Sequence, residues 1–267
     1  MSHPAPRPPA EPVAVKPAAT VVLVRDAPTA GLEVFMLRRT TSAAFAGGMY
    51  VFPGGKVDEA DGGREIEQYC GGFDDAAASA ALGLDHGGLA YWVAAIRECF
   101  EEAGLLLARP TEETPFFVVD ADRRAVHAGE LSMVELCRRD GLALDLSALR
   151  YVAHWVTPEG ETPRRFDTRF FLAVAPADQE GVHDDSETVH SMWIRPAEAL
   201  DQAALGELIM MPPTIANLQA IANCASAADA LAQADAAAPP ERIQPRLRRD
   251  ASGAVVGVSV PGDADYA

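Results

Sequence analysis

Three glutamates and an arginine stand within six residues of one another, in a segment whose apolar residues recur with helical spacing: Arg97, Glu98, Glu101 and Glu102. At about 100° per residue, Glu98 and Glu102 project from one side of such a helix, and Cys99 with its apolar neighbours projects from the other. Like charges four residues apart repel, and a bound divalent cation would reverse that effect. Arg97 can hold Glu101 in place. The alternative is a solvated acidic face with one ordinary ion pair.

The overall charge of the chain restricts its partners. Among 267 residues, 39 are acidic and 22 are basic, so that the formal net charge is −17. This charge argues against nucleic acid or an anionic membrane surface as a partner. If the ligand is itself a phosphate compound, positive charge must be supplied locally, and a metal ion can supply it.

The acidic helix is the end of a longer motif that begins with a glycine. Gly55 is followed by an acidic residue, Asp61, and then by RECFEEAGL at 97–105. This pattern resembles the signature of the Nudix hydrolase family, in which a glycine and a glutamate precede Arg-Glu-apolar-x-Glu-Glu-x-Gly-apolar. The chain departs from it twice, because Asp61 replaces the glutamate and the spacer, residues 62–96, is much longer than usual.

The long spacer resembles the peroxisomal coenzyme A diphosphatase branch of that family, which carries an insertion inside its signature. Three further segments resemble the branch: 39–55, 154–172 and 250–266. The resemblance therefore spans most of residues 18–266. Arg39 and Gly48 fit the coenzyme A signature of the branch, whereas Ala44 stands where a second arginine is usual.

The resemblance implies an α/β Nudix fold, with a mixed β-sheet sandwiched between helices, a helical insertion and a C-terminal helical extension. It also implies that Glu98, Glu101 and Glu102 bind Mg²⁺ or Mn²⁺, with the carbonyl oxygen of Gly54 as a further ligand. Such cations would bridge a diphosphate, neutralise its charge and lower the pKa of an attacking water. Glu101 and Arg97 are accordingly expected among the catalytic residues.

Further candidates lie outside the helix. Glu187 stands in the acidic loop HDDSE; a loop glutamate of Nudix relatives at such a place serves as metal ligand or general base, and a solvated acid is the alternative. Arg164 and Arg165 precede an apolar run, and paired guanidiniums suit a phosphate such as the 3'-phosphate of coenzyme A. A charged turn is the alternative there. The expected substrate-binding residues are Arg39, Gly55, Arg164 and Arg165.

The expected reaction is metal-dependent hydrolysis of a nucleoside diphosphate linked to another group. Coenzyme A or acyl-coenzyme A is the first candidate, with 3',5'-ADP and phosphopantetheine or its acyl derivative as products. Two alternatives stay open, namely the same chemistry on NADH, ADP-ribose or another nucleotide, and a Nudix-like module that senses a nucleotide without cleaving it. The sequence leaves open whether the protein forms a homodimer.

The elements that must position these residues can be read from the hydrophobic pattern. Strands are expected at 19–24, 32–37, 50–52, 151–156, 166–174 and 188–194, with a strand-like run at 254–260. Helices are expected at 75–82, 89–107, 121–139, 196–205 and 212–238.

The expected organisation is one Nudix domain with two appended parts. It comprises a disordered proline-rich tail at 1–17, the Nudix domain at 18–208 with an insertion at 62–88, and a C-terminal helix and strand-containing tail at 209–267. The four cysteines form no CxxC pair, so reduced thiols in the cytoplasm are expected. No transmembrane segment is expected.

Overall fold

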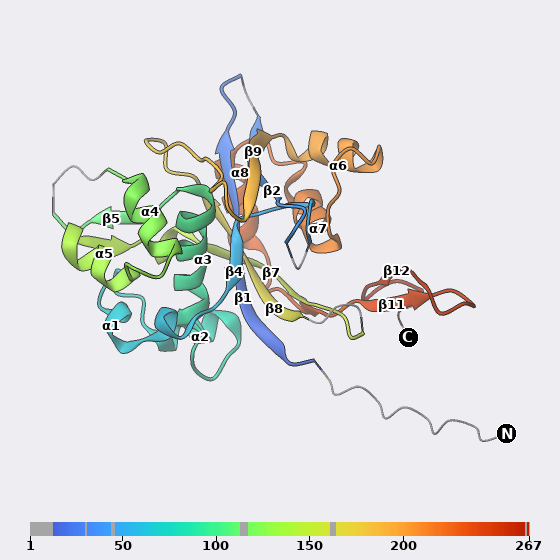
Figure 1. The fold of residues 1–267 in the computed structure, drawn as a ribbon, viewed down its shortest axis with the longest axis horizontal. Helices are drawn as coiled ribbons and strands as arrows, with labels where there is room; N and C mark the ends of the chain where they lie inside the picture. The colour runs from blue at the N-terminus through green and yellow to red at the C-terminus, as the bar shows by residue number, and fades with distance from the viewer. Residues whose placement is uncertain are drawn as a thin grey trace.

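The computed structural model describes residues 13–29, 31–43, 46–112, 117–160, 164–264 and 266. In this part of the chain one mixed β-sheet lies between two layers of helices (Figure 1). The expected α/β fold is therefore confirmed. Residues 1–12 of the expected tail and Ala44 lie outside the described residues, and the first strand begins at Val15.

Strand β1 (Val15–Asp26) forms the centre of the sheet. It pairs in parallel with β8 (Arg165–Val174) on one side and antiparallel with β2 (Leu32–Arg39) on the other. The other long strands are β7 (Arg150–Val156), which pairs with β8, and β9 (Thr188–Ile194), which pairs with β2. The run VVLV at 21–24 is buried throughout because helices cover both faces of this strand.

Two short strands fill the place where β1 and β2 separate. Strand β3 (Tyr50–Val51) pairs with β2, and β4 (Gly54–Lys56) pairs with β1. The chain crosses between them at Pro53, whose carbonyl oxygen accepts a hydrogen bond from the amide of Val21 at 2.9 Å. The two glycines of β4 are thereby held against the middle of the sheet.

The helices form two layers with two separate cores. One face carries α1 (Arg64–Glu67), α2 (Asp75–Leu82), α3 (Leu89–Ala103), α4 (Asp120–His127) and α5 (Met133–Asp140), and the other carries α6 (Pro196–Ala204), α7 (Pro212–Ile221) and α8 (Ala227–Ala236). The remaining elements are the 3₁₀ helices Glu59–Gly62 and Leu146–Ala148, the pair β5 (Ala108–Pro110) and β6 (Leu142–Leu144), edge strand β10 (Arg242–Ile243), and the hairpin β11 (Arg246–Arg249) and β12 (Val255–Ser259). Among the described residues, none of the helices has both the length and the apolarity to cross a bilayer.

Residues 62–88, which separate Asp61 from α3, contribute to the core on the face of the sheet that carries α1 to α5. Ile66, Ala78 and Leu82, from α1 and α2, are buried in the same cluster as Trp92 of α3. The carboxylate of Asp75 accepts hydrogen bonds from the backbone amides of Gly87 and Leu89, both at 2.9 Å. The insertion therefore caps the start of α3, where the first amides of a helix have no partner within the helix.

Most of the expected elements are present, and two expected helices are wrong. The helix expected at 121–139 is two helices, α4 and α5, because Gly129 takes a left-handed φ of 71° and Ser132 caps a new helix. The helix expected at 212–238 is likewise two helices, α7 and α8, and the side chain of Ser226 caps the second one. The helix expected at 89–107 ends at Ala103. At 121–139 and at 212–238 the helical periodicity is continuous, but a serine caps a second helix and divides each stretch in two.

We predict that Asp75→Ala lowers the free energy of unfolding by about 1 kcal/mol, because the amide of Leu89, the first residue of α3, and the amide of Gly87 just before the helix lose their acceptor. Asp85→Ala, an exposed acid in the same segment, is the matched control and should change stability by less than about 0.5 kcal/mol. Urea denaturation of both variants measures the difference. Equal stability of the two variants would show that Asp75 does not cap α3.

Candidate active site

Helix α3 presents its acidic side to strand β4. Its opposite side buries Ile96, Cys99 and Phe100 in the core, as the helical spacing predicts. Glu102 is only 2% exposed, and its carboxylate accepts a hydrogen bond from the backbone amide of Gly54 at 3.0 Å. The acidic face is therefore covered by β4 rather than solvated.

Arg97 connects the acidic face to the segment that follows β4. Its guanidinium binds both carboxylate oxygens of Asp61, at 2.8 and 2.9 Å, and donates to the backbone carbonyl of Lys56 at 2.8 Å. It also contacts Glu98 at 2.9 Å and Glu101 at 3.0 Å. The contact with Glu101 is the one that the i, i+4 spacing predicts. Asp61, which replaces the first glutamate of the motif, thus fixes Arg97 and lies 1% exposed.

Gly54 and Gly55 are glycines because other atoms occupy the space of a side chain. A Cβ atom at Gly55 would lie 2.6 Å from both carboxylate oxygens of Glu98. A Cβ atom at Gly54 would lie 2.5 Å from the hydroxyl of Thr20 and 2.6 Å from the carbonyl oxygen of Ala19. This close approach brings the backbone of β4 into direct contact with the acidic helix.

The buried carboxylates need positive charge. Burial raises the pKa of Glu98 to about 8, against the effect of Arg97 and reinforced by the charge of Glu101. Burial and the neighbouring Glu98 also raise the pKa of Glu102 well above its ordinary range. A divalent cation would neutralise this pair, and clustered carboxylate oxygens are the ligands that Mg²⁺ prefers. The donor set therefore fits such an ion.

The carboxylates are not arranged as a ready-made coordination sphere. Over the described ranges of the chain, no three Asp, Glu, His or Cys side chains form a group that could hold a metal ion as they stand. Arg97 binds Glu98 and Glu101, and Arg39 lies 3.5 Å from Glu102. The positive charges of these arginines would compete with an ion for the carboxylate oxygens. The carbonyl of Gly54 as a metal ligand stays a prediction.

Glu187 lies in a loop that Asp184 organises. The carboxylate of Asp184 accepts hydrogen bonds from the backbone amides of Glu187, at 3.1 Å, and Thr188, at 2.8 Å. Burial alone would raise the pKa of Asp184, but hydrogen bonds from Ser186, Thr188 and the backbone hold it at about 2. Asp184 is thus occupied in shaping the loop. Glu187 reaches toward the acidic face and pairs with Arg39 at 3.0 Å.

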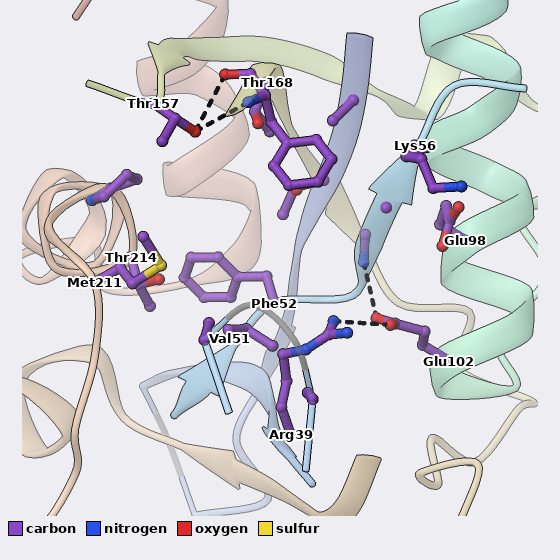
Figure 2. A pocket seen from close by; sticks show the side chains of 18 of the residues that line it. Arg39, Val51, Phe52, Lys56, Glu98, Glu102, Thr157, Thr168, Met211 and Thr214 are labelled. Carbon is purple, nitrogen blue, oxygen red and sulfur yellow. Dashed lines mark hydrogen bonds and ion pairs between the residues drawn. The ribbon is translucent and has the colours of Figure 1, made fainter. Parts of the chain in front are cut away.

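A cavity of about 760 Å³ joins these groups. Figure 2 shows Glu98 and Glu102 along one wall, with Arg39 directed at Glu102 and, in this view, Phe52 between the glutamates and Met211. The rest of the lining includes several aromatic and apolar residues, namely Trp155, Phe166, Phe170, Met211, Pro245 and Val258. The cavity therefore has an acidic part and an apolar part, as a ligand with a charged centre and a less polar end requires.

The structure separates the two adjacent arginines. Arg164 lines the cavity, together with Phe166 and Thr168 of β8. Arg165 is 6% exposed on the other side of the strand, where it donates to the carbonyl of Thr157 at 3.1 Å. Successive side chains of a strand point to opposite faces, so a neighbouring pair cannot both face one ligand. Of the two arginines, only Arg164 lines the cavity.

His127 and the apolar lining are parts of the cavity that the sequence does not predict. The Nδ1 atom of His127 lies 3.7 Å from a carboxylate oxygen of Glu101, and its Nε2 atom lies 3.3 Å from the hydroxyl of Ser186. It ends α4, inside the stretch expected to be one longer helix. Only the break at Gly129 could have indicated a helix end here, and no spacing motif points to this histidine. The apolar lining comes from segments that are distant in sequence.

The fold, the acidic helix and the glycine strand together define a protein of the Nudix class. Comparison with family models narrows this further: the chain belongs to the NUDT19 Nudix domain family, whose model matches residues 74–221. This match confirms the resemblance found in the sequence. The matched range begins after β4 and Asp61. These residues are included in the candidate site because of their contacts with Arg97 and Glu98.

Curated relatives and a solved structure agree with this family. The acyl-coenzyme A diphosphatase NUDT19 of Xenopus laevis is 27% identical over 72% of this chain and 60% of its own length. The human protein of the same name is 28% identical over 74% and 62%. The chain thus spans about 60% of the length of these relatives. A crystal structure of a Nudix hydrolase from Alicyclobacillus acidocaldarius matches with a TM-score of 0.69 and 31% identity, over 82% of this chain and 96% of that one.

We predict that Gly55→Ala destabilises the protein by about 1–3 kcal/mol and weakens Mn²⁺ binding, because the new methyl group must displace the carboxylate of Glu98. Gly63→Ala is the matched control, since a Cβ atom there meets nothing nearer than 3.5 Å. Urea denaturation and calorimetric Mn²⁺ titration measure both effects. Wild-type stability and Mn²⁺ affinity in Gly55→Ala would contradict the close packing of β4 on α3.

Proposed function

We propose that the chain hydrolyses the diphosphate bond of coenzyme A or acyl-coenzyme A, giving 3',5'-ADP and phosphopantetheine or its acyl derivative. The proposal rests on one observation: the acidic face of α3, the glycines of β4 and a group of apolar side chains line the same cavity. The names of the curated relatives support this substrate class. The proposed cofactor is Mg²⁺ or Mn²⁺.

Each residue of the acidic part has a proposed task. A cation held by Glu98, Glu101 and Glu102 would neutralise diphosphate charge and lower the pKa of the attacking water. Arg97 orients Glu98 and Glu101 through its two contacts. The amide of Gly54 holds Glu102. Glu187, 49% exposed at its side chain and part of the cavity lining, is proposed to accept a proton from that water.

The apolar end is proposed to receive the nucleotide. Phe166 offers an aromatic wall for the adenine ring, and Arg164 lies beside it in the cavity lining. A guanidinium is well suited to a terminal phosphate, which coenzyme A carries at its 3' position. Because the diphosphate would lie over β4, the pantetheine arm is then directed toward the part lined by Thr40 and Ser186.

The proposed location of the protein is the cytoplasm. All four cysteines are free and buried, which supports the expected reducing environment of the cytoplasm. A small-molecule nucleotide diphosphate is the proposed partner.

We predict that the protein cleaves coenzyme A or its acyl derivatives only in the presence of Mg²⁺ or Mn²⁺, and that Glu101→Gln lowers kcat by about 100-fold or more. Glu67→Gln, an exposed glutamate of α1, is the control and should keep wild-type kcat. The protein is incubated with coenzyme A, acyl-coenzyme A, NADH, ADP-ribose and diadenosine compounds, and the products are identified by mass spectrometry.

Each alternative corresponds to a distinct result of this experiment. Preferred cleavage of NADH or ADP-ribose would replace the proposed substrate by another nucleotide. Binding of a nucleotide without cleavage, under every cation tested, would favour the sensing module. Metal-independent cleavage, or full kcat in Glu101→Gln, would contradict the assignment of the acidic face.

We predict that wild type prefers coenzyme A over 3'-dephospho-coenzyme A by about 10- to 100-fold in kcat/KM, and that Arg164→Ala loses this preference. Arg165→Ala is the matched control, because Arg165 lies outside the cavity lining and contacts Thr157. That variant should keep the preference and lose stability instead. Equal kcat/KM values of wild type for the two substrates would mean that the 3'-phosphate is not recognised.

A further inference from the structure

The guanidinium of Arg39 lies between two carboxylates that come from distant parts of the chain. Its Nη1 atom is 3.5 Å from Oε1 of Glu102, and its Nη2 atom is 3.0 Å from Oε2 of Glu187. Figure 2 shows this side chain directed at Glu102 across the cavity. We infer that Arg39 is an internal counter-ion that competes with the divalent cation for Glu102 and leaves it when the cation binds.

The backbone around Arg39 is fixed, so the competition concerns the side chain alone. Arg39 is the last residue of β2, where the register with β9 shifts so that it pairs with Thr188. Its amide donates to the carbonyl of Met49 at 3.0 Å, and the amide of Thr40 donates to the carbonyl of Glu187 at 2.9 Å. The guanidinium is thereby held within reach of both acids.

The hydrogen bonding of the guanidinium is incomplete in this position. The Nε atom of Arg39 is buried, and within the described residues it has no hydrogen-bond partner. A buried donor without an acceptor costs free energy. Attraction to Glu102 and Glu187 therefore keeps the side chain in place, and neutralising Glu102 would remove a main part of that attraction.

Arg39 lines the cavity, so a released guanidinium is within reach of a ligand bound there. Guanidinium groups bind phosphate oxygens well, so the released side chain can contact the diphosphate. Arg39 would then weaken cation binding in the absence of substrate and favour substrate binding once the cation is in place. The inference goes beyond the proposed function and rests on it in one respect, that a divalent cation binds at the acidic face.

The test is a calorimetric titration of the metal-free protein with Mn²⁺ alone. Arg39→Gln and Arg39→Met remove the charge and should bind Mn²⁺ with a Kd about ten-fold lower than wild type. Arg39→Lys keeps the charge and should stay near the wild-type Kd. Arg38→Gln removes a neighbouring, exposed charge outside the cavity lining and should change the Kd by less than about two-fold, because solvent screens it.

Thermal unfolding in chelator and in excess Mn²⁺ provides a second readout. Without the cation, both neutral variants should melt below wild type, because Glu102 and Glu187 lose their counter-ion, and Mn²⁺ should raise their Tm by more than it raises that of wild type. Unchanged or weaker Mn²⁺ binding in both neutral variants would overturn the inference and leave the proposed function standing. Failure of every protein, wild type included, to bind Mn²⁺ would overturn the proposed metal site and the inference with it.

Discussion

The buried guanidinium of Arg97 holds together the parts of the protein that the proposed chemistry requires. It binds Asp61 with two hydrogen bonds, contacts Glu98 and Glu101 of its own helix, and donates to the backbone of the last residue of β4, Lys56. The insertion that separates Asp61 from Arg97 in sequence is bridged by this contact. Because the bidentate pair with Asp61 fixes the direction of the guanidinium as well as its distance, Arg97 presents one nitrogen to both Glu98 and Glu101 of α3.

The same arrangement leaves the site short of positive charge. Glu98 and Glu102 are buried, and burial raises the pKa of both. Buried carboxylates are costly unless they are paired or bind a metal. Arg97 and Arg39 supply part of the pairing in the absence of an ion. A divalent cation would neutralise Glu102 in place of Arg39 and would also attract a phosphate ligand to a chain of net charge −17. Both the net charge of the chain and the buried carboxylates of the site therefore favour a bound cation.

The sequence predicts what local spacing determines and misses what the tertiary fold determines. Helical periodicity places Glu98 and Glu102 opposite Cys99, and the pairing of Arg97 with Glu101 follows from it. By contrast, Arg164 and Arg165 look equivalent in sequence, and only the alternation of β8 separates them. His127 lies near Glu101 because α4 stops early, which depends on Gly129 and the cap at Ser132. The apolar end combines segments as far apart as Phe52 and Val258, and no local pattern reveals that.

We propose that a divalent cation binds at the acidic face of α3, beneath β4. Crystals of the protein grown with Mn²⁺ test it directly, because anomalous scattering locates manganese independently of the protein atoms. We expect an anomalous peak within coordination distance, about 2.0–2.4 Å, of carboxylate oxygens from at least two of Glu98, Glu101 and Glu102. A peak elsewhere on the molecule, or none at saturating Mn²⁺, would contradict it.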